Sequence, residues 1–380
     1  MILAIYGILI LFIYILELIT HKRLRFFLPF ITVIYFIIMM GGNISNPDTT
    51  IYYNIYNNKE FFYKDFGFGI LVYICNHKFG LDINAFRLLL AIIGIGMMSR
   101  IVNKYVKKQI VYYLLYFLYP FMMDVVQVRN FLIMCILMNA VDFLLDKSKI
   151  SIVKYIILIL IAATIQKTAL VYLPLVIIHR IESKKIIRLL IIASAVFSIF
   201  IGFNSGIVNT LGNFLLNSVS DSLSGSSKFL TRNTNFGWII LWCEQICNCI
   251  LIFWSKRILE KSEKICRDNP YLLKQSYDKN KKFFNLVFWI NIYLFCFCPL
   301  YVLNINFYRI MRNVMTINLM IYSITWNLRR NWSSSNRIIY GCSIWGYAIF
   351  VFYVNFFYNG SGEYIDSILK PMFTMNWLFQ

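Results

Sequence analysis

The sequence has few charged residues and none of the short motifs that mark nucleotide-dependent enzymes. Asp, Glu, Lys and Arg together make up 14% of its 380 residues. It contains no phosphate-binding P-loop, no glycine-rich dinucleotide fingerprint and no Asp-x-Asp motif. An enzyme that uses nucleotide sugars is therefore disfavoured.

Metal-binding patterns are missing as well. The nine cysteines include no Cys-x-x-Cys pair, and most lie in apolar runs, where cysteine packs as a small hydrophobic residue. The three histidines, His21, His77 and His179, are scattered along the chain. We therefore predict no metal site and no cofactor.

Apolar residues dominate what is present. Hydrophobic residues make up 59% of the chain and aromatic residues 18%, and the mean hydropathy is +0.66. Repeated apolar runs of about 17–20 residues are typical of membrane-spanning helices. We predict an all-α, polytopic integral membrane protein with about twelve transmembrane helices (roughly ten to fourteen), organised as one membrane domain over residues 1–380.

The net charge of +20 follows the predicted topology. Most of the 37 lysine and arginine residues fall in segments predicted to be cytoplasmic, as the positive-inside rule requires. The longest such segment is a basic loop over residues 255–282, and the outer loops cover residues 43–66 and 204–235. A small set of outer cations remains, and these need another explanation.

Three segments between the outer loops carry further structural expectations. Residues Ile110–Val125 are predicted to form one continuous helix. Thr168–Ile178 is apolar but short for a full span, and Gly67–Phe79 is expected to be an interfacial or re-entrant segment.

The first candidate site lies in the outer loop over residues 43–66. Asp48, Tyr52 and Tyr56 are spaced four residues apart, so a helix would place them on one face. A carboxylate base with tyrosines stacked on sugar rings would have this pattern. The alternative is an interfacial aromatic belt, which tyrosine-rich loops often form.

The second candidate site joins two apolar runs at Asp124 and at Gln127, Arg129 and Asn130. An arginine facing lipid at the bilayer centre would cost roughly 2.5–3.5 kcal/mol. The guanidinium fork of Arg129 is suited to phosphate. The alternative is a side chain that only reaches back to the membrane surface.

Two weaker candidates follow. Arg309 and Arg312 share a helix face, which is favourable if an anion or a buried carboxylate lies between them. Gln166 and Lys167 separate two short helices, where the lysine either binds the same anion or simply ends a helix hairpin. Among the outer carboxylates, Asp48 and Asp124 are our candidates for a general base.

The order of these patches resembles the EpsG family of Wzy-like polysaccharide polymerases. The motifs that carry the resemblance extend over residues 43–175, with a weaker echo at Arg309, and comprise Asp48-x3-Tyr52-x3-Tyr56, Asp65-Phe66-Gly67, Gln127-x-Arg129 and Gln166-Lys167-Thr168-Ala169. Two positions depart from the family pattern: Gln166 stands in place of a histidine and Asn130 in place of a common glutamine. A glutamine cannot titrate near neutral pH, so an acid–base role is in doubt there.

The resemblance implies a glycosyltransferase of GT-C-like architecture, with no metal or cofactor. Its substrate would be undecaprenyl diphosphate bearing an oligosaccharide repeat, polymerised at the outer face of the bacterial inner membrane. A chain-length regulator and a flippase would be partners, and no nucleic acid would bind. In this hypothesis Arg129, Arg309 and Arg312 stabilise the leaving diphosphate and Asp48 or Asp124 accepts a proton. Substrate contacts would come from Tyr52, Tyr56, Gln127, Asn130, Asp124, Gln166 and Lys167.

Three other functions fit a membrane protein of this kind. A flippase of lipid-linked oligosaccharide needs cations along a path through the bilayer, whereas the outer cations here gather at helix ends. A ligase that resembles O-antigen ligases would use the same donor with another acceptor. A non-catalytic scaffold of an export complex would pair its arginines with carboxylates of a partner.

Overall fold

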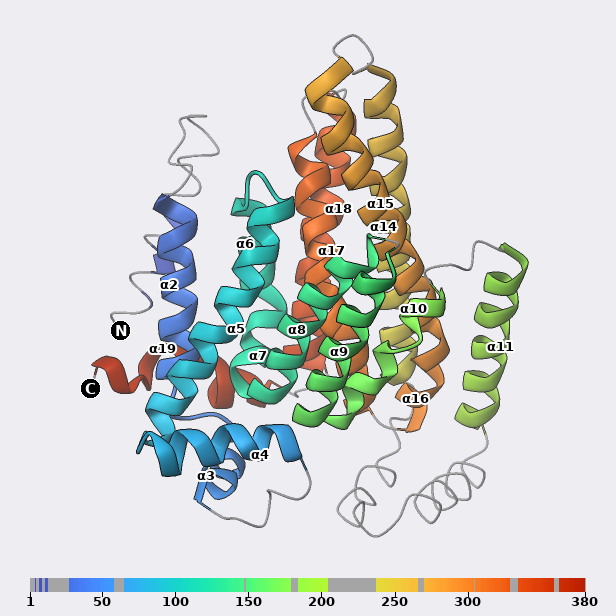
Figure 1. The fold of residues 1–380 in the computed structure, drawn as a ribbon. Helices are drawn as coiled ribbons and strands as arrows, with labels where there is room; N and C mark the ends of the chain where they lie inside the picture. Colours follow the sequence, from blue (N-terminus) through green and yellow to red (C-terminus); the bar gives the residue numbers. More distant parts are fainter. Residues whose placement is uncertain are drawn as a thin grey trace. The chain divides into compact units, whose positions relative to one another are not determined.

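The computed structural model of the chain (Figure 1) describes residues 4, 7–8, 11–12, 27–57, 65–146, 148–178, 184–203, 237–265, 270–303, 305–328, 334–358 and 362–379. The predicted outer loop over residues 204–235 lies outside these residues. In the described part the chain is helical, and its only β-type pairing is an isolated bridge between Asn43 and Asn376.

The described residues form α-helices, 3-10 helices and π-helices, and the labels and bounds of these elements are given in chain order. They are α2 (Phe27–Gly42), α3 (Thr49–Asn57), α4 (Phe66–Tyr73), η2 (Ile74–Lys78), α5 (Ile83–Tyr105), α6 (Ile110–Tyr116), η3 (Phe117–Phe121), α7 (Met122–Val126), α8 (Val128–Leu144), α9 (Lys149–Ile165), η4 (Lys167–Tyr172), α10 (Leu175–Ile178), α11 (Lys184–Phe203), α14 (Gly237–Ile265), α15 (Pro270–Leu294), η7 (Phe295–Phe297), α16 (Cys298–Leu303), η8 (Ile305–Tyr308), α17 (Arg309–Asn327), α18 (Ser334–Tyr353), η10 (Val354–Tyr358), η11 (Ile365–Leu369), α19 (Lys370–Thr374) and η12 (Trp377–Phe379).

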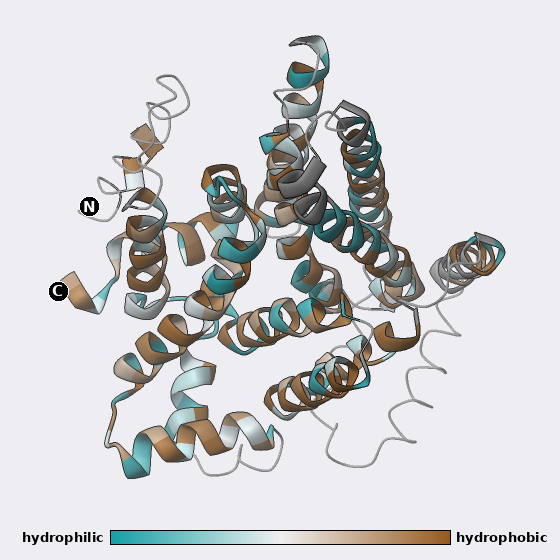
Figure 2. Ribbon diagram, turned by 45° about the horizontal axis from the view of Figure 1, so that its top comes forward, coloured by the Kyte–Doolittle hydropathy of each residue, from teal (hydrophilic) through white to brown (hydrophobic). Residues whose placement is uncertain are grey.

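Apolar surface confirms that this is a helical membrane protein. Apolar residues predominate over most of the helices in Figure 2. Helix α9 shows the pattern of a lipid-facing helix: Ile150, Val153, Ile157 and Ile161 are exposed along one face, while the opposite face is buried. Four described stretches are long and apolar enough to cross a membrane: Ile83–Tyr105, Gly237–Lys261, Asp278–Val302 and Ser335–Tyr358.

The predicted count of about twelve spans is not reached among the described residues because several predicted spans are interrupted. The segment Ile110–Val125 was expected to be one helix, but it is divided into α6, η3 and α7. Tyr119 has extended backbone angles (φ −168°, ψ 132°), and Pro120 has no N–H to donate to a helix. The segment Thr168–Ile178 is similarly divided into η4 and α10, with Pro174 between them.

The predicted basic loop over residues 255–282 is largely helical. Its first part extends α14 to Ile265, and its last part, from Pro270, belongs to α15. The expectation of a long loop was wrong because the point where each apolar run ends was taken as the end of its helix. A helix that leaves the apolar layer can continue in water with lysine and glutamate, which are good helix formers.

Contacts divide the chain into two compact units, which are described separately. Unit 1 comprises Met1–Leu170 and Leu319–Gln380, and unit 2 comprises Val171–Asn318.

Unit 1 is built on α5 and α8, which approach closely. A Cβ atom on Gly94 of α5 would lie 2.2 Å from the ring of Phe131 in α8, so only glycine allows this contact. On the other side of α5, a Cβ atom on Gly41 of α2 would lie 2.7 Å from the Cα of Leu88. Small residues at such contacts let membrane helices pack backbone to backbone.

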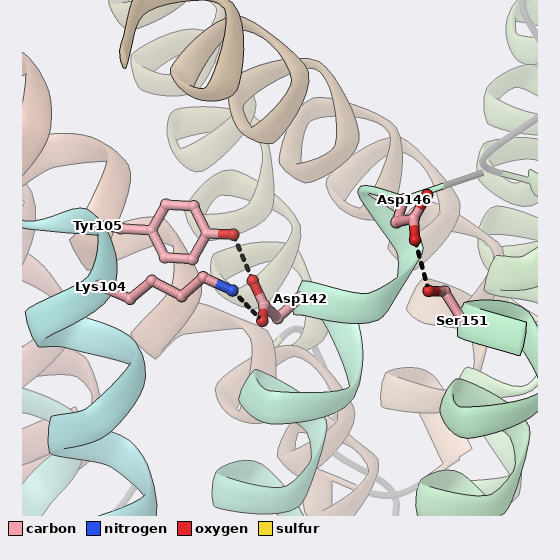
Figure 3. Close-up of polar contacts among 5 residues, drawn as sticks. All are labelled: Lys104, Tyr105, Asp142, Asp146 and Ser151. Atoms are coloured by element: carbon pink, nitrogen blue, oxygen red, sulfur yellow. Dashed lines mark hydrogen bonds and ion pairs between the residues drawn. The ribbon is translucent and has the colours of Figure 1, made fainter. Parts of the chain in front are cut away.

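Polar contacts at their last turns also join α5 and α8 (Figure 3). Lys104 forms an ion pair with Asp142, and the Tyr105 hydroxyl donates a hydrogen bond to the same carboxylate. Just beyond α8, the hydroxyl of Ser151 in α9 donates to Asp146 at 2.8 Å. One end of the α5–α8–α9 group is therefore tied together by carboxylates.

The segment after α19 returns to the end of α2. The side chain of Asn376 donates to the carbonyl of Ile38 at 2.9 Å, and the Trp377 indole donates to the carbonyl of Gly41 at 3.2 Å. A Cβ atom on Gly42 would lie 2.1 Å from the Asn376 amide, so this contact requires glycine. The end of α2 that leads into α3 is thereby fixed.

Unit 2 holds its helices together with buried amides. Gln245 of α14 donates to the carbonyl of Asn291 in α15 at 2.7 Å. Asn291 and Asn318 exchange two side-chain hydrogen bonds of 2.8 and 2.9 Å. Such pairs satisfy polar groups that an apolar core would otherwise leave without partners.

Candidate functional site

Arg129 lies in the first turn of α8, where backbone N–H groups have no partner within the helix. Its own N–H donates a hydrogen bond of 3.2 Å to the hydroxyl oxygen of Tyr52, from α3. The start of α8 is thus anchored to α3. This contact joins two of the motifs that the sequence singled out.

The side chain of Arg129 is held by one carboxylate and two rings. Its guanidinium group forms an ion pair with Asp65. Its Cζ atom lies 5.9 Å from the centroid of the Tyr52 ring and 5.8 Å from that of Phe68, both within the range of cation–π attraction. The Arg129 side chain remains 24% exposed and that of Asp65 20% exposed. The pair is therefore oriented by the protein and still reachable.

Asp65 is brought to Arg129 by the close packing of α4 on α9. A Cβ atom on Gly67 would lie 2.0 Å from the Oγ1 atom of Thr164, so any larger residue would push the two helices apart. In Figure 1, α4 runs across the direction of α5. This packing explains why an acidic residue two positions before a glycine matters here.

The electrostatics of the cluster are dominated by burial and two cations. Burial raises the pKa of the Asp65 carboxyl above its ordinary value, and the positive charges of Arg129 and Lys167 oppose this rise. Lys167, which is exposed, thus acts on the same carboxylate as Arg129. Two cations around one carboxylate leave net positive charge, which favours an anionic ligand.

The first candidate site divides between two roles. Residues Thr49–Asn57 do form a helix, so Asp48 and Tyr52 lie one turn apart, and the half-buried Asp48 precedes the helix. Tyr56 is used elsewhere: its hydroxyl donates to the carbonyl of Leu81 at 2.7 Å, and its ring packs 5.1 Å from that of Phe86. Tyr56 therefore fixes α3 in place, and Tyr52 contacts Arg129.

Two of the predicted residues beside Arg129 are buried. Asp124 is fully buried and accepts a hydrogen bond of 3.0 Å from the Tyr116 hydroxyl. Asn130 is 2% exposed, whereas Gln127, which caps α8, is half-buried. Of the two amide side chains, Gln127 is thus the more accessible to a substrate.

The Gln166 and Lys167 pair lies where α9 ends. Gln166 has extended backbone angles, and its carbonyl accepts from the Ala169 N–H at 3.1 Å, which turns the chain into η4. Gln166 is half-exposed and Lys167 exposed. The side chain of Lys167 is connected to the Arg129 cluster through its charge on Asp65.

Arg309 and Arg312 belong to unit 2, where they open α17. Arg309 donates to Asn306 at 3.5 Å and is half-buried, whereas Arg312 is 2% exposed. A buried carboxylate is present in this unit: Glu244 of α14 accepts from the hydroxyl of Tyr308, directly before Arg309. A buried carboxylate, one of the two predicted partners of these arginines, is therefore bonded to the residue that precedes Arg309.

Sequence reasoning missed two residues of this site. Asp65 was quoted as part of a motif but was not chosen as a site residue, and Phe68 was not singled out. Another basic residue, Arg87 near the start of α5, was counted among the outer cations and given no function. The signal for Asp65 was present in its spacing to Gly67, and the signal for Arg87 was a charge inside an apolar run.

No group of three or more His, Cys, Asp or Glu side chains suited to a metal ion occurs among the described residues. No curated protein and no solved structure matches the chain. The sequence profile of the EpsG family matches residues 25–366, which is most of its length. The chain therefore belongs to the EpsG family, a family of polysaccharide polymerase-like membrane proteins.

Proposed function

We propose that this protein polymerises lipid-linked oligosaccharide repeats into a surface polysaccharide. The growing glycan on undecaprenyl diphosphate is the donor, and one lipid-linked repeat is the acceptor. An acceptor hydroxyl forms a new bond to the anomeric carbon of the donor, and the bond between that carbon and the lipid diphosphate breaks. The lipid diphosphate leaves with the electron pair of that bond, and the hydroxyl proton goes to a protein base.

One observation carries this proposal: a reachable, oriented arginine within a net-positive cluster. Arg129 is held by Asp65, Tyr52 and Phe68, with Lys167 acting on the same carboxylate. Negative charge grows on the leaving diphosphate, and preorganised cations stabilise such charge most where it develops. Membership of a family of polymerase-like proteins supports the same reaction.

The other roles follow from placement. Asp48, at the start of α3, is the proposed base because it is half-buried, whereas Asp124 is fully buried with Tyr116. Tyr52 orients Arg129, and the half-buried Gln127 and the exposed Lys167 would contact the substrate. In unit 2, Arg309 and Arg312 keep their proposed role in binding phosphate. Asn130, Gln166 and Tyr56 would act by supporting these groups.

The proposal places the protein in the inner membrane of a bacterium, with Arg129 at the periplasmic or extracellular face. About twelve spans would be completed by the short and broken helices, with neighbouring helices covering their ends. A chain-length regulator and a flippase are the proposed partners. The reaction needs no metal and no nucleotide.

The first test deletes the gene and displays the surface glycan on a gel. We expect the long-chain ladder to disappear and a single repeat to remain. Wild type should restore the ladder, and Arg129→Ala should not. Arg129→Lys should restore it poorly because a point charge does not reproduce the guanidinium fork. Arg100→Ala, an exposed arginine of α5, is the matched control and should restore the ladder fully.

The same gel separates the other functions. Loss of the single repeat as well would favour a flippase or a ligase. An unchanged ladder after deletion would leave the scaffold function. Full activity of Arg129→Lys would contradict the requirement for a guanidinium fork and leave positive charge as the only role of this side chain.

A further inference from the structure

A second arginine of unit 1 is buried, and no carboxylate of the described residues forms an ion pair with it. Arg87 lies near the start of α5 and is 5% exposed. Within the described part of the chain, its side chain donates one hydrogen bond, of 3.5 Å, to the Oδ1 atom of Asn43. The same oxygen also accepts from Asn46 at 2.8 Å, so it is shared. The Nε atom of Arg87 has no partner among the described residues.

This arrangement is costly for a protein that only needs to pack. A buried guanidinium group requires a compensating charge or a full set of hydrogen bonds. None of the ion pairs in the described part of the chain includes Arg87. The group is therefore prepared for a negative charge that the described residues do not supply.

Arg87 and Arg129 meet at the same residue. The positive charge of Arg87 acts on Tyr52. The guanidinium group of Arg129 lies over the Tyr52 ring, and the backbone N–H of Arg129 donates to the Tyr52 hydroxyl oxygen. The two arginines come from adjacent helices, because α5 and α8 are packed through Gly94 and Phe131. They differ in one respect: Arg129 is paired with the carboxylate of Asp65, whereas no carboxylate of the described residues forms an ion pair with Arg87.

We propose that Arg87 and Arg129 form one site beside Tyr52 for the two phosphates of a diphosphate. Arg87 binds one phosphate and Arg129 the other. This inference rests on the proposed function, which supplies the lipid diphosphate, and it adds a residue and a specificity. A monophosphate would engage one arginine only, so Arg87 selects diphosphate over monophosphate.

The test measures binding to the full chain, purified into lipid nanodiscs. Polyprenyl diphosphate and polyprenyl monophosphate of equal chain length are the probes. We expect wild type to bind the diphosphate more tightly. Arg87→Gln should lower diphosphate affinity by about tenfold or more and leave monophosphate affinity within about twofold. Arg100→Gln should change neither.

The outcomes separate this inference from the proposed function. If wild type prefers diphosphate and Arg87→Gln keeps that preference, the Arg87 inference fails and the proposed function stands. If wild type shows no preference, both the Arg87 inference and the lipid diphosphate substrate fail. If Arg87→Gln loses both lipids, Arg87→Lys decides: a loss confined to diphosphate supports the inference, and no loss overturns it.

Inorganic diphosphate distinguishes the two sources of the recognised group. We expect it to compete with the polyprenyl diphosphate only weakly, because it lacks the apolar tail. Competition at equal affinity would overturn the lipid assignment and identify a soluble diphosphate as the ligand.

Discussion

At the scale of single residues, the site depends on how Arg129 shares its charge. Asp65 orients the guanidinium group but also competes with any anion for it. Tyr52 and Phe68 hold the group through their rings, which compete for no hydrogen-bond donor. Arg129 is thereby kept in one position while part of its surface stays available.

Asp65 gives a pH-dependent stability with a defined sign. Its pKa is raised by burial, so the folded protein binds the proton more tightly than the unfolded chain does. The stabilisation from this group is present below the unfolded pKa and is lost as the pH rises through the folded pKa. We therefore expect Asp65→Asn to be at least as stable as wild type at neutral pH, with an advantage that shrinks in acid. Thermal unfolding from pH 3 to pH 8 would measure this. A variant less stable at neutral pH than in acid, relative to wild type, would contradict it.

The two tyrosines of α3 provide a matched pair of variants. Tyr52→Phe removes the acceptor for the Arg129 N–H, and Tyr56→Phe removes the donor to Leu81. Each should cost about 1 kcal/mol of stability. Only Tyr52→Phe should also shorten the glycan ladder, since it alone loosens Arg129. Equal effects on the ladder would show that α3 acts only through its packing.

The sequence predicted the members of this residue cluster better than their roles. Arg129, Tyr52 and Lys167 were identified from charge and spacing. Arg129 and Lys167 both act on Asp65, and Tyr52 contacts Arg129. The burial of Asp124 could not be predicted, because it depends on a hydrogen bond from Tyr116, which lies on the other side of the helix break. A pattern of residue types does not tell which carboxylate finds a hydroxyl partner.

At the scale of helices, the approach of α4 to α9 places Asp65. This approach depends on the absence of a side chain at Gly67 beside Thr164. It could not be predicted from either segment alone, because the helices are distant in sequence. The breaks at Pro120 and Pro174 are visible in the sequence, yet the apolar runs around them favoured continuous helices.

A single methyl group tests this helix contact. Gly67→Ala should lower the stability by roughly 1–3 kcal/mol and abolish the ladder, since its Cβ overlaps Thr164. Adding Thr164→Gly should restore part of both, because it removes the overlapping side-chain atoms. Gly96→Ala in α5 is the control: it meets nothing within 4 Å and should be neutral or stabilising by up to about 1 kcal/mol. A fully active Gly67→Ala would show that α4 need not touch α9.

At the scale of the whole molecule, the class of protein was predictable from composition, and the helix count was not. Apolar content alone identified a helical membrane protein. Counting apolar runs gave about twelve spans because each run was taken as a crossing. Where a proline divides an apolar run, length and hydropathy do not show whether the two helical segments cross the membrane as one span.

Helix α9 offers a direct test of the proposed orientation. Its ends are marked by two exposed lysines, Lys149 and Lys167. In a background without the nine native cysteines, Lys167→Cys should react with an impermeant thiol reagent from outside and Lys149→Cys only from inside. Labelling of both from the same side would contradict a spanning α9.

The polar contacts between the last turns of α5 and α8 have a consequence for ligand selectivity. Lys104, Tyr105 and Asp142 join the last turns of the two helices, and Arg87 and Arg129 lie near their first turns. The separation of Arg87 and Arg129 is therefore set by helix packing before any ligand binds. Preorganised gaps favour the ligand of matching length. Asp142→Asn weakens the contacts between the last turns of the two helices. It should therefore reduce the preference for polyprenyl diphosphate over polyprenyl monophosphate and leave the affinity for the monophosphate unchanged.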